Sequence, residues 1–195
     1  MKARRDSGFS LTELVVAMAV AMILMAVAMP YFLRAYHFYQ LSNAATQMAD
    51  ILRLTRYEAI RLNRTVDCVI QPDPGNPTMT RASMTDVNGN PLTGVSARVA
   101  LLGSGGNLVD AGAVTGAGTL PAKAGLGATI PTAVPPAGGT LQFDPRGALN
   151  PANITVFYLN SPGSPDSGFR AVLLMPAGSI QIWAGDSGGN WQQTR

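Results

Sequence analysis

Cysteine, histidine and charge are all scarce in this chain of 195 residues. There is one cysteine, Cys68, and one histidine, His37, and charged residues make up only 13% of the total. A single cysteine excludes an intramolecular disulfide. One histidine with no cysteine beside it makes a metal site of the zinc type improbable. Cys68 lies in an apolar stretch, so we expect it to pack in the core as a small hydrophobe.

Sequence motifs of catalysis are also absent. The chain contains no G-x-S-x-G, no Walker loop and no H-E-x-x-H. Its aspartates are scattered, and Asp73, Asp144, Asp166 and Asp186 stand beside glycine or proline, as turn residues do. We therefore expect a protein that is not an enzyme and has no cofactor and no metal. Calcium stays an alternative only if the loops at Asp166–Gly168 and Asp186–Gly189 meet.

Net basicity belongs mostly to the first eight residues. The chain has 14 basic and 11 acidic residues, a net charge of +3 and a pI of about 9.4. Residues 1–8 hold Lys2, Arg4, Arg5 and Asp6, so the remainder has 11 basic and 10 acidic residues and a net charge of +1. The high pI therefore does not argue for nucleic-acid binding.

A long apolar run follows this basic segment. No charged side chain occurs from Leu14 to Leu33, and about 20 apolar residues suffice to span a bilayer core of about 30 Å. Cations before the run favour a cytoplasmic N-terminus. One carboxylate, Glu13, stands at the head of the run. A charged side chain in a bilayer is costly, and the insertion free energy of Asp at the centre of a transmembrane helix is about 2.5–3.5 kcal/mol.

Gly8, Phe9, Leu11 and Glu13, with the apolar run behind them, resemble the class III signal of type IV pilins and the related pseudopilins of type II secretion. The resemblance implies that a prepilin peptidase cuts the Gly8–Phe9 bond and removes residues 1–8 as a leader. It also implies N-methylation of Phe9 and retention of Glu13 for assembly. Pro30 falls where many pilins have a helix-kinking proline.

The position of Glu13 agrees with that resemblance on physical grounds. Phe9 and Glu13 are four residues apart, so on a helix the freed Phe9 ammonium could pair with its own Glu13 or that of a neighbouring subunit. An ordinary secretory signal peptide is an alternative reading. Ala26-Val27-Ala28 resembles its cleavage site, and cutting there would give a protein starting at Met29.

The helical pattern continues beyond the apolar run. Apolar and small residues recur at steps of three and four from Leu41 to Leu62, and no glycine and one proline occur between Phe9 and Asn63. We expect an α+β pilin fold with one helix over about 9–63, about 80 Å long and kinked near Pro30. Residues 9–33 would be its transmembrane and filament-core half, and 34–63 its amphipathic half, packed on an antiparallel sheet.

Residues 64–195 are expected to form a β-rich periplasmic domain. The expected strands are Thr65–Ile70, Met79–Val87, Val95–Leu102, Thr140–Asp144, Ile154–Leu159, Phe169–Met175 and Ser179–Trp183. The last two are expected to form a hairpin. A segment over about 103–139 is rich in Gly, Ala, Thr and Pro, and is expected to be a long surface loop.

A second resemblance lies in this domain. Arg56, Glu58, Ala59, Ile60, Asn63 and Val66 are similar to the R-x-E-A-I-x-x-N-x-x-V stretch of H-type pseudopilins and FimT/FimU-like minor pilins (the GspH/FimT group). Leu141–Gly147 is similar to that group's F-x-P-x-G element, and Phe169–Trp183 to its closing hairpin.

The two resemblances together imply a structural subunit, a minor pilin or pseudopilin, of a type IV pilus or a type II secretion pseudopilus. Its expected partners are other pilin or pseudopilin subunits, the prepilin peptidase and the inner-membrane assembly platform. It would lie in the bacterial inner membrane as a single-pass protein, its N-terminus cytoplasmic and its globular domain periplasmic, and then in the pilus or pseudopilus.

Two other functions stay open at this point. A DNA-uptake minor pilin would use the basic cluster Arg53, Arg56, Arg61 and Arg64, although those residues also suit contacts between subunits. Some minor pilins of the FimT-like group bind DNA through arginines near the C-terminus, and this chain has no Arg or Lys between Gly178 and Arg195. A plain membrane-anchored or secreted binding protein is the other alternative.

Overall fold

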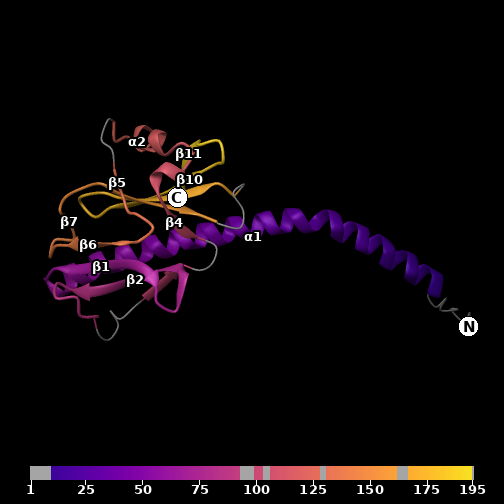
Figure 1. Ribbon diagram of the computed structural model, residues 1–195, viewed down its shortest axis with the longest axis horizontal. Coiled ribbons are helices and arrows are strands. Elements are labelled where there is room, and N and C mark those ends of the chain that lie inside the picture. Colours follow the sequence, from indigo (N-terminus) through magenta and orange to yellow (C-terminus); the bar gives the residue numbers. More distant parts are fainter. Residues whose placement is uncertain (1–9, 93–98, 103–105, 128–130, 162–166, 195) are drawn as a thin grey trace, which may run out of the picture. The chain divides into compact units, whose positions relative to one another are not determined.

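The structure is a computed structural model that describes residues 10–92, 99–102, 106–127, 131–161 and 167–194. The chain divides between Tyr36 and His37 into two compact units. The first unit is helical, and the second contains the rest of the helix and all the strands. Figure 1 labels the elements in chain order.

The first unit is the start of helix α1 (Leu11–Leu62). Its apolar stretch has a mean hydropathy of 2.4 over 18 residues and none of that window is buried, so α1 has the length and composition to cross a membrane. The helix continues through Pro30 without interruption. The proline removes one backbone donor, and a kink there stays a prediction.

In the second unit the helix packs one face into the core and stops at Asn63. Its buried residues recur at helical spacing from Leu41 to Ala59. Asn63 adopts a left-handed conformation at φ 48°. The N–H groups of Asn63 and Arg64 donate to the carbonyls of Ile60 and Ala59. This is a Schellman cap, which satisfies the last carbonyls of the helix, and Asn tolerates that φ better than most residues.

Sheet A has five strands in the order β3-β2-β1-β6-β7. Their bounds are β1 Val66–Asp73, β2 Asn76–Asp86, β3 Val99–Leu102, β6 Gly139–Phe143 and β7 Leu149–Asn150. All neighbouring pairs are antiparallel. Burial alternates along β1, with Val66, Cys68 and Ile70 buried, so one face of the sheet covers the core.

Sheet B has six strands in the order β11-β10-β9-β8-β4, with β5 also paired to β8. Their bounds are β4 Asn107–Val109, β5 Thr132–Ala133, β8 Thr155–Asn160, β9 Phe169–Leu174, β10 Ile180–Gly185 and β11 Trp191–Thr194. The β9–β10 hairpin is as expected. The β5–β8 pair is parallel, and the other pairs are antiparallel.

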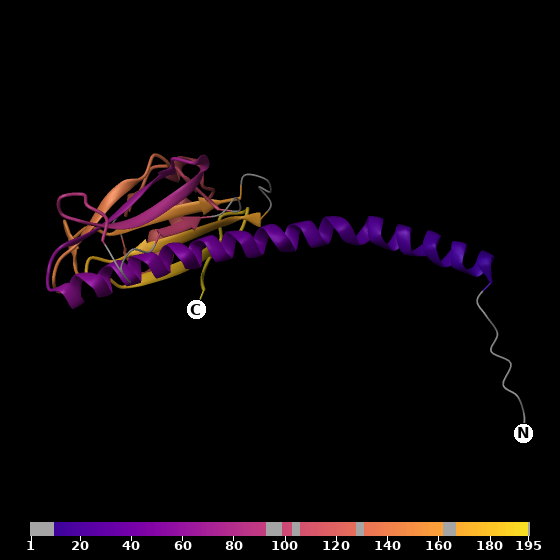
Figure 2. The same ribbon diagram turned by 90° about the horizontal axis from the view of Figure 1, so that it is seen from below.

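The main core lies between α1 and the two sheets. In Figure 1 the magenta strands of sheet A and the orange and yellow strands of sheet B lie on either side of the C-terminal part of α1, and Figure 2 shows that part running along them. Alternate residues of sheet B, including Phe157, Leu159, Val172 and Leu174, join the helix residues in this core. The expected helix on an antiparallel β domain is confirmed, but with two sheets in place of one.

Residues of sheet B that point the other way form a second core. Val156, Tyr158, Ala171 and Leu173 pack with Val114, Leu120 and the two tryptophans Trp183 and Trp191. Both faces of β8 and β9 are therefore covered, which explains why their burial patterns show almost no alternation.

The segment at 103–139 is more ordered than the expected surface loop. Its described part contains β4, the 3-10 turns η2 (Ala111–Ala113) and η3 (Ala117–Thr119), the short helix α2 (Leu120–Lys123) and β5. Leu120 is completely buried and Val114 is 5% exposed. Few but well-spaced apolar residues thus suffice to dock a Gly- and Ala-rich segment onto a sheet that has an uncovered apolar face.

Four tight turns share one geometry: Asp86–Asn90, Asp144–Ala148, Met175–Ser179 and Asp186–Asn190. In each, the first N–H donates to the fifth carbonyl, and the fourth residue's N–H donates to the first carbonyl. The fourth residue is always glycine, with φ between 78° and 83°. This is a three-residue hairpin connection closed by a glycine bulge, which only glycine enters without strain.

Candidate assembly site

Helix α1 begins at a side-chain cap. Ser10 Oγ accepts the backbone N–H of Glu13 at 3.2 Å, and the Ser10 carbonyl accepts the N–H groups of Glu13 and Leu14, both at 3.1 Å. Ser10 and Glu13 thus stand in the S-x-x-E spacing of a capping box. Ser10 was not among the residues predicted from the sequence, although the S-x-x-E spacing indicates a helix cap. Gly8 and Phe9, the expected cleavage site, lie outside the described residues.

Behind the cap, α1 carries a continuous apolar surface. Large side chains from Leu14 to Leu33 are between 44% and 75% exposed in the single chain. Isolated soluble chains rarely expose such a surface, so it needs a hydrocarbon or protein environment. Glu13 at the head of this surface is the position that the resemblance assigns to docking between subunits.

At the other end of α1, Arg56 joins the helix to two turns. Its Nη1 donates to the carbonyl of Gly178 at 3.1 Å. A Cβ on Gly147 would lie 2.9 Å from both Cγ and Nε of Arg56, so the arginine side chain packs against that turn as well. The Leu149 N–H also donates to the Pro176 carbonyl at 2.8 Å, which ties the two turns to each other.

This arrangement explains the second resemblance physically. Arg56 comes from the R-x-E-A-I stretch, Gly147 from the F-x-P-x-G element and Gly178 from the closing hairpin. The structure brings the three segments together where sheet A, sheet B and α1 meet. These motif residues therefore hold the β domain on the helix, and their shared role is architectural.

Two of the other expected arginines make ion pairs inside the chain. Arg61 Nη2 lies 2.7 Å from Oε2 of Glu58, whose side chain is 4% exposed, and this carboxylate raises the pKa of Arg61. Arg53 pairs with Asp50 at 2.9 Å on the surface. Exposed Arg64 contributes a smaller part of the lowered pKa of Asp86, which comes mainly from the backbone N–H of Asn90. Arg53, Arg56 and Arg61 thus all have partners within the chain.

Arg170 on β9 is a buried cation that the sequence reasoning missed. It is 2% exposed, and burial lowers the pKa of its guanidinium. Its Nε and Nη2 donate to Ser42 Oγ on α1 at 3.3 and 3.1 Å, and its Nη1 donates to the Phe169 carbonyl at 2.9 Å. A lone Arg inside an apolar strand was the available signal, because such a residue requires polar partners when it is buried.

Cys68 and Asp186 are two further titratable groups that the sequence singled out. Cys68 is fully buried, and burial raises its pKa to about 12, which leaves it a neutral thiol. The Asp186 carboxylate accepts hydrogen bonds from the backbone N–H and the side-chain amide of Asn190. Within the described ranges no three His, Cys, Asp or Glu side chains gather as metal ligands. Asp166, the other half of the calcium alternative, lies outside those ranges.

Two family models match different parts of the chain. The family model of the prokaryotic N-terminal methylation motif matches residues 3–29. That of the type II transport protein GspH matches residues 44–178. No curated protein matches the sequence. The crystal structure of the type IV minor pilin FimU from Pseudomonas aeruginosa is similar at 12% identity and a TM-score of 0.36, over 80% of this chain and 90% of that one.

The methylation motif thus covers the basic segment before the helix, the capped helix start and most of the apolar run, and fits anchoring in an inner membrane. The GspH match covers well over half of the chain, including Arg56, Gly147 and the closing hairpin. The chain is a type IV pilin- or pseudopilin-like subunit, and it belongs to the family of the type II transport protein GspH.

Proposed function

We propose that this protein is a structural subunit, a minor pilin or pseudopilin, of a type IV pilus or a type II secretion pseudopilus. The observation that carries the proposal is the exposed apolar length of α1, together with a methylation motif over residues 3–29. A packed filament of such helices would bury this surface, as the inner membrane does before assembly.

In this proposal the prepilin inserts with residues 1–8 in the cytoplasm and the second unit in the periplasm. The prepilin peptidase cuts between Gly8 and Phe9, and Phe9 is then methylated. An inner-membrane platform transfers the helix from the bilayer into the filament. Glu13 guides docking, because its carboxylate meets the ammonium of Phe9 at the start of a neighbouring helix in a medium of low dielectric constant.

The role of the second unit in this proposal is positional rather than catalytic. Its motif residues around Arg56 fasten the sheets to α1, so the exposed surfaces of the sheets and turns are displayed at a defined place in the filament. The DNA-uptake alternative gains no support, because Arg53, Arg56 and Arg61 are already engaged within the chain.

Mass spectrometry of the mature N-terminus, purified from membranes, tests the proposal. We expect a chain that starts with N-methylphenylalanine at Phe9. A Gly8→Val variant should keep its leader, whereas the neighbouring Ser7→Val variant should be cut normally. A chain starting at Met29, or an uncut wild-type chain, would overturn the proposal in favour of a secreted or plainly anchored protein.

Deletion of the gene distinguishes the two machines. Loss of exported enzymes from the medium, with surface pili intact, would assign the subunit to a secretion pseudopilus. Loss of pili with secretion intact would assign it to a pilus. A deletion strain with both functions unchanged would contradict a role in either filament.

A further inference from the structure

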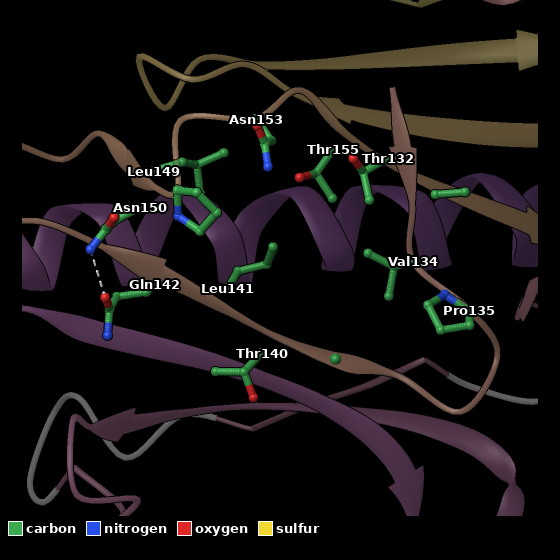
Figure 3. A pocket seen from close by; sticks show the side chains of 13 residues that line it. Thr132, Val134, Pro135, Thr140, Leu141, Gln142, Leu149, Asn150, Asn153 and Thr155 are labelled. Carbon is green, nitrogen blue, oxygen red and sulfur yellow. Dashed lines mark hydrogen bonds between the residues drawn. The ribbon is translucent and has the colours of Figure 1, made fainter. Parts of the chain in front are cut away.

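A pocket opens between sheet A and sheet B. Its volume is about 210 Å³. Figure 3 shows it framed by β6 and β7 of sheet A, by β5 and β8 of sheet B, and by the turns that follow β5 and β7. Val134, Pro135, Leu141 and Leu149 give it apolar walls, and Thr155 adds a hydroxyl.

On the sheet A side, the pocket borders an open stretch of strand edge. β7 pairs with β6 only at Gln142 and Phe143. The Asp144 N–H bonds to Ala148 across this hairpin. The direction of the N–H and C=O groups alternates along a strand. The N–H and C=O of Gln142 and of Thr140 therefore face the β7 side, as those of Asp144 do. Since β7 ends at Asn150, the backbone of Thr140 meets no strand there, and no described residue bonds to it.

On the sheet B side, β5 offers a second open edge. Thr132 and Val134 donate their N–H groups to the carbonyls of Ile154 and Val156 at 2.8 and 3.0 Å. By the same alternation, the N–H and C=O of Ala133 point away from β8. Within the described part of the chain neither group has a hydrogen-bond partner. Ala133 and Thr140 both line the pocket.

The chemistry of the walls defines what fits. None of the 13 lining residues is charged, so a charged side chain would lose its hydration without gaining a partner. The volume equals roughly seven water molecules at about 30 Å³ each, which limits the occupant to small side chains. The side-chain amides of Gln142 and Asn150 already bond to each other at 3.0 Å. The outward main-chain groups, the threonine hydroxyls and the Asn153 amide are the other polar groups of the lining.

We propose that this pocket binds an extended peptide segment of another protein, with small uncharged side chains, as an added strand between β6 and β5. Its backbone would bond to Thr140 on one side and Ala133 on the other, and its inward side chains would fill the apolar walls. Strand addition of this kind takes affinity from main-chain hydrogen bonds and specificity from the pocket. The site does not depend on the proposed filament role.

A pentapeptide, valyl-alanyl-threonyl-valyl-glycine amide with fluorescein on its N-terminus, tests the site against the full-length protein in detergent micelles. Fluorescence anisotropy should show saturable binding. The same peptide with its central amides N-methylated cannot extend a sheet, and should bind at least about tenfold more weakly, as the loss of one or two hydrogen bonds predicts. Equal binding of both peptides, or no saturable binding of either, would overturn the proposal.

Protein variants locate the binding. Thr140→Pro and Ala133→Pro each remove one outward N–H, and each should weaken binding about tenfold. Gln193→Pro is the matched control, because the β10–β11 turn geometry points the Gln193 N–H to the open edge of sheet B away from the pocket. It should bind within about twofold of wild type. If the control loses binding as much as Ala133→Pro does, the site is not this pocket.

Discussion

The guanidinium of Arg170 lies over the aromatic ring of Phe38, with 4.4 Å between its central carbon and the ring centroid. Arg170 comes from the middle of sheet B, and Phe38 from the start of the α1 segment within the second unit. Among the described residues no carboxylate forms an ion pair with this arginine. A ring face, the Ser42 hydroxyl and one carbonyl therefore solvate a buried charge.

Ser42→Ala should destabilise the protein by about 1.5–3 kcal/mol, because two N–H groups of a buried cation lose their acceptor. Thr46→Ala, one turn further along α1 and exposed, is the control and should change the free energy of unfolding by less than about 0.5 kcal/mol. Urea denaturation of the full-length chain in micelles measures both. Equal effects of the two substitutions would contradict the role given to Ser42.

Gly178→Ala should cost clearly more stability than Gly89→Ala. Both glycines hold the fourth position of the same turn, at φ 78° and 81°, so the strain of a side chain at positive φ, about 1–2 kcal/mol, is common to both. A Cβ on Gly178 would also collide with the Gly147 carbonyl and lie 2.8 Å from Arg56 Nε, whereas a Cβ on Gly89 meets nothing. The difference between the two losses of unfolding free energy measures how tightly the two turns pack around Arg56. Equal losses would show that these contacts adjust to a Cβ without cost.

Cys68 should make the protein less stable as the pH rises above about 8.5, the usual thiol pKa. Burial raises its folded-state pKa to about 12. The folded chain thus holds the neutral thiol, and its contribution is complete below the unfolded pKa and is lost as the pH rises toward the folded one. The difference in unfolding free energy between wild type and Cys68→Ala, followed from about pH 7 to pH 11, isolates the thiol from the tyrosines that both proteins share. A difference that stays constant over this range would contradict the assignment.

In the same protein, Cys68 should react with a thiol reagent only after unfolding, since the reactive species is the thiolate. The rate of labelling in native micelles, compared with the rate in denaturing urea, gives the measurement. Labelling at equal rates would show that the thiol is accessible in the folded state.

Glu13→Ala should leave leader cleavage intact but block incorporation into filaments. The carboxylate is expected to pair with the Phe9 ammonium of a neighbouring subunit, and alanine provides no counter-charge. Thr12→Ala is the neighbouring control and should be incorporated normally. Immunoblots of sheared filaments, together with the mass of the mature N-terminus, separate cleavage from assembly. Normal incorporation of Glu13→Ala would refute the docking role.

Local signals predicted the helix and the turns well. α1 ends one residue before the expected stop, because Asn63 is both a poor helix former and a good left-handed cap. The hairpin of β9 and β10 follows from two apolar runs around Pro176-Ala177-Gly178. In each of these cases neighbouring residues decide the structure, so the pattern is visible in the sequence.

Contacts between distant segments were not predictable in the same way. Strand β11, W-Q-Q-T, has a single apolar residue and shows no alternation, and it exists because Trp191 packs on the second core. Leu120 lies in a Gly- and Ala-rich segment, and its burial depends on the free face of sheet B. The joint at Arg56 unites residues up to 122 positions apart, and no local pattern encodes such a meeting.

The second core has a practical side. Val114, Leu120 and their neighbours are the cover over Val156, Tyr158, Ala171 and Leu173 on the outer face of sheet B. Shortening the chain between β4 and β5, as one would trim a surface loop to obtain crystals or to graft an epitope, would strip that cover. The product would expose an apolar β surface to solvent and would be expected to aggregate.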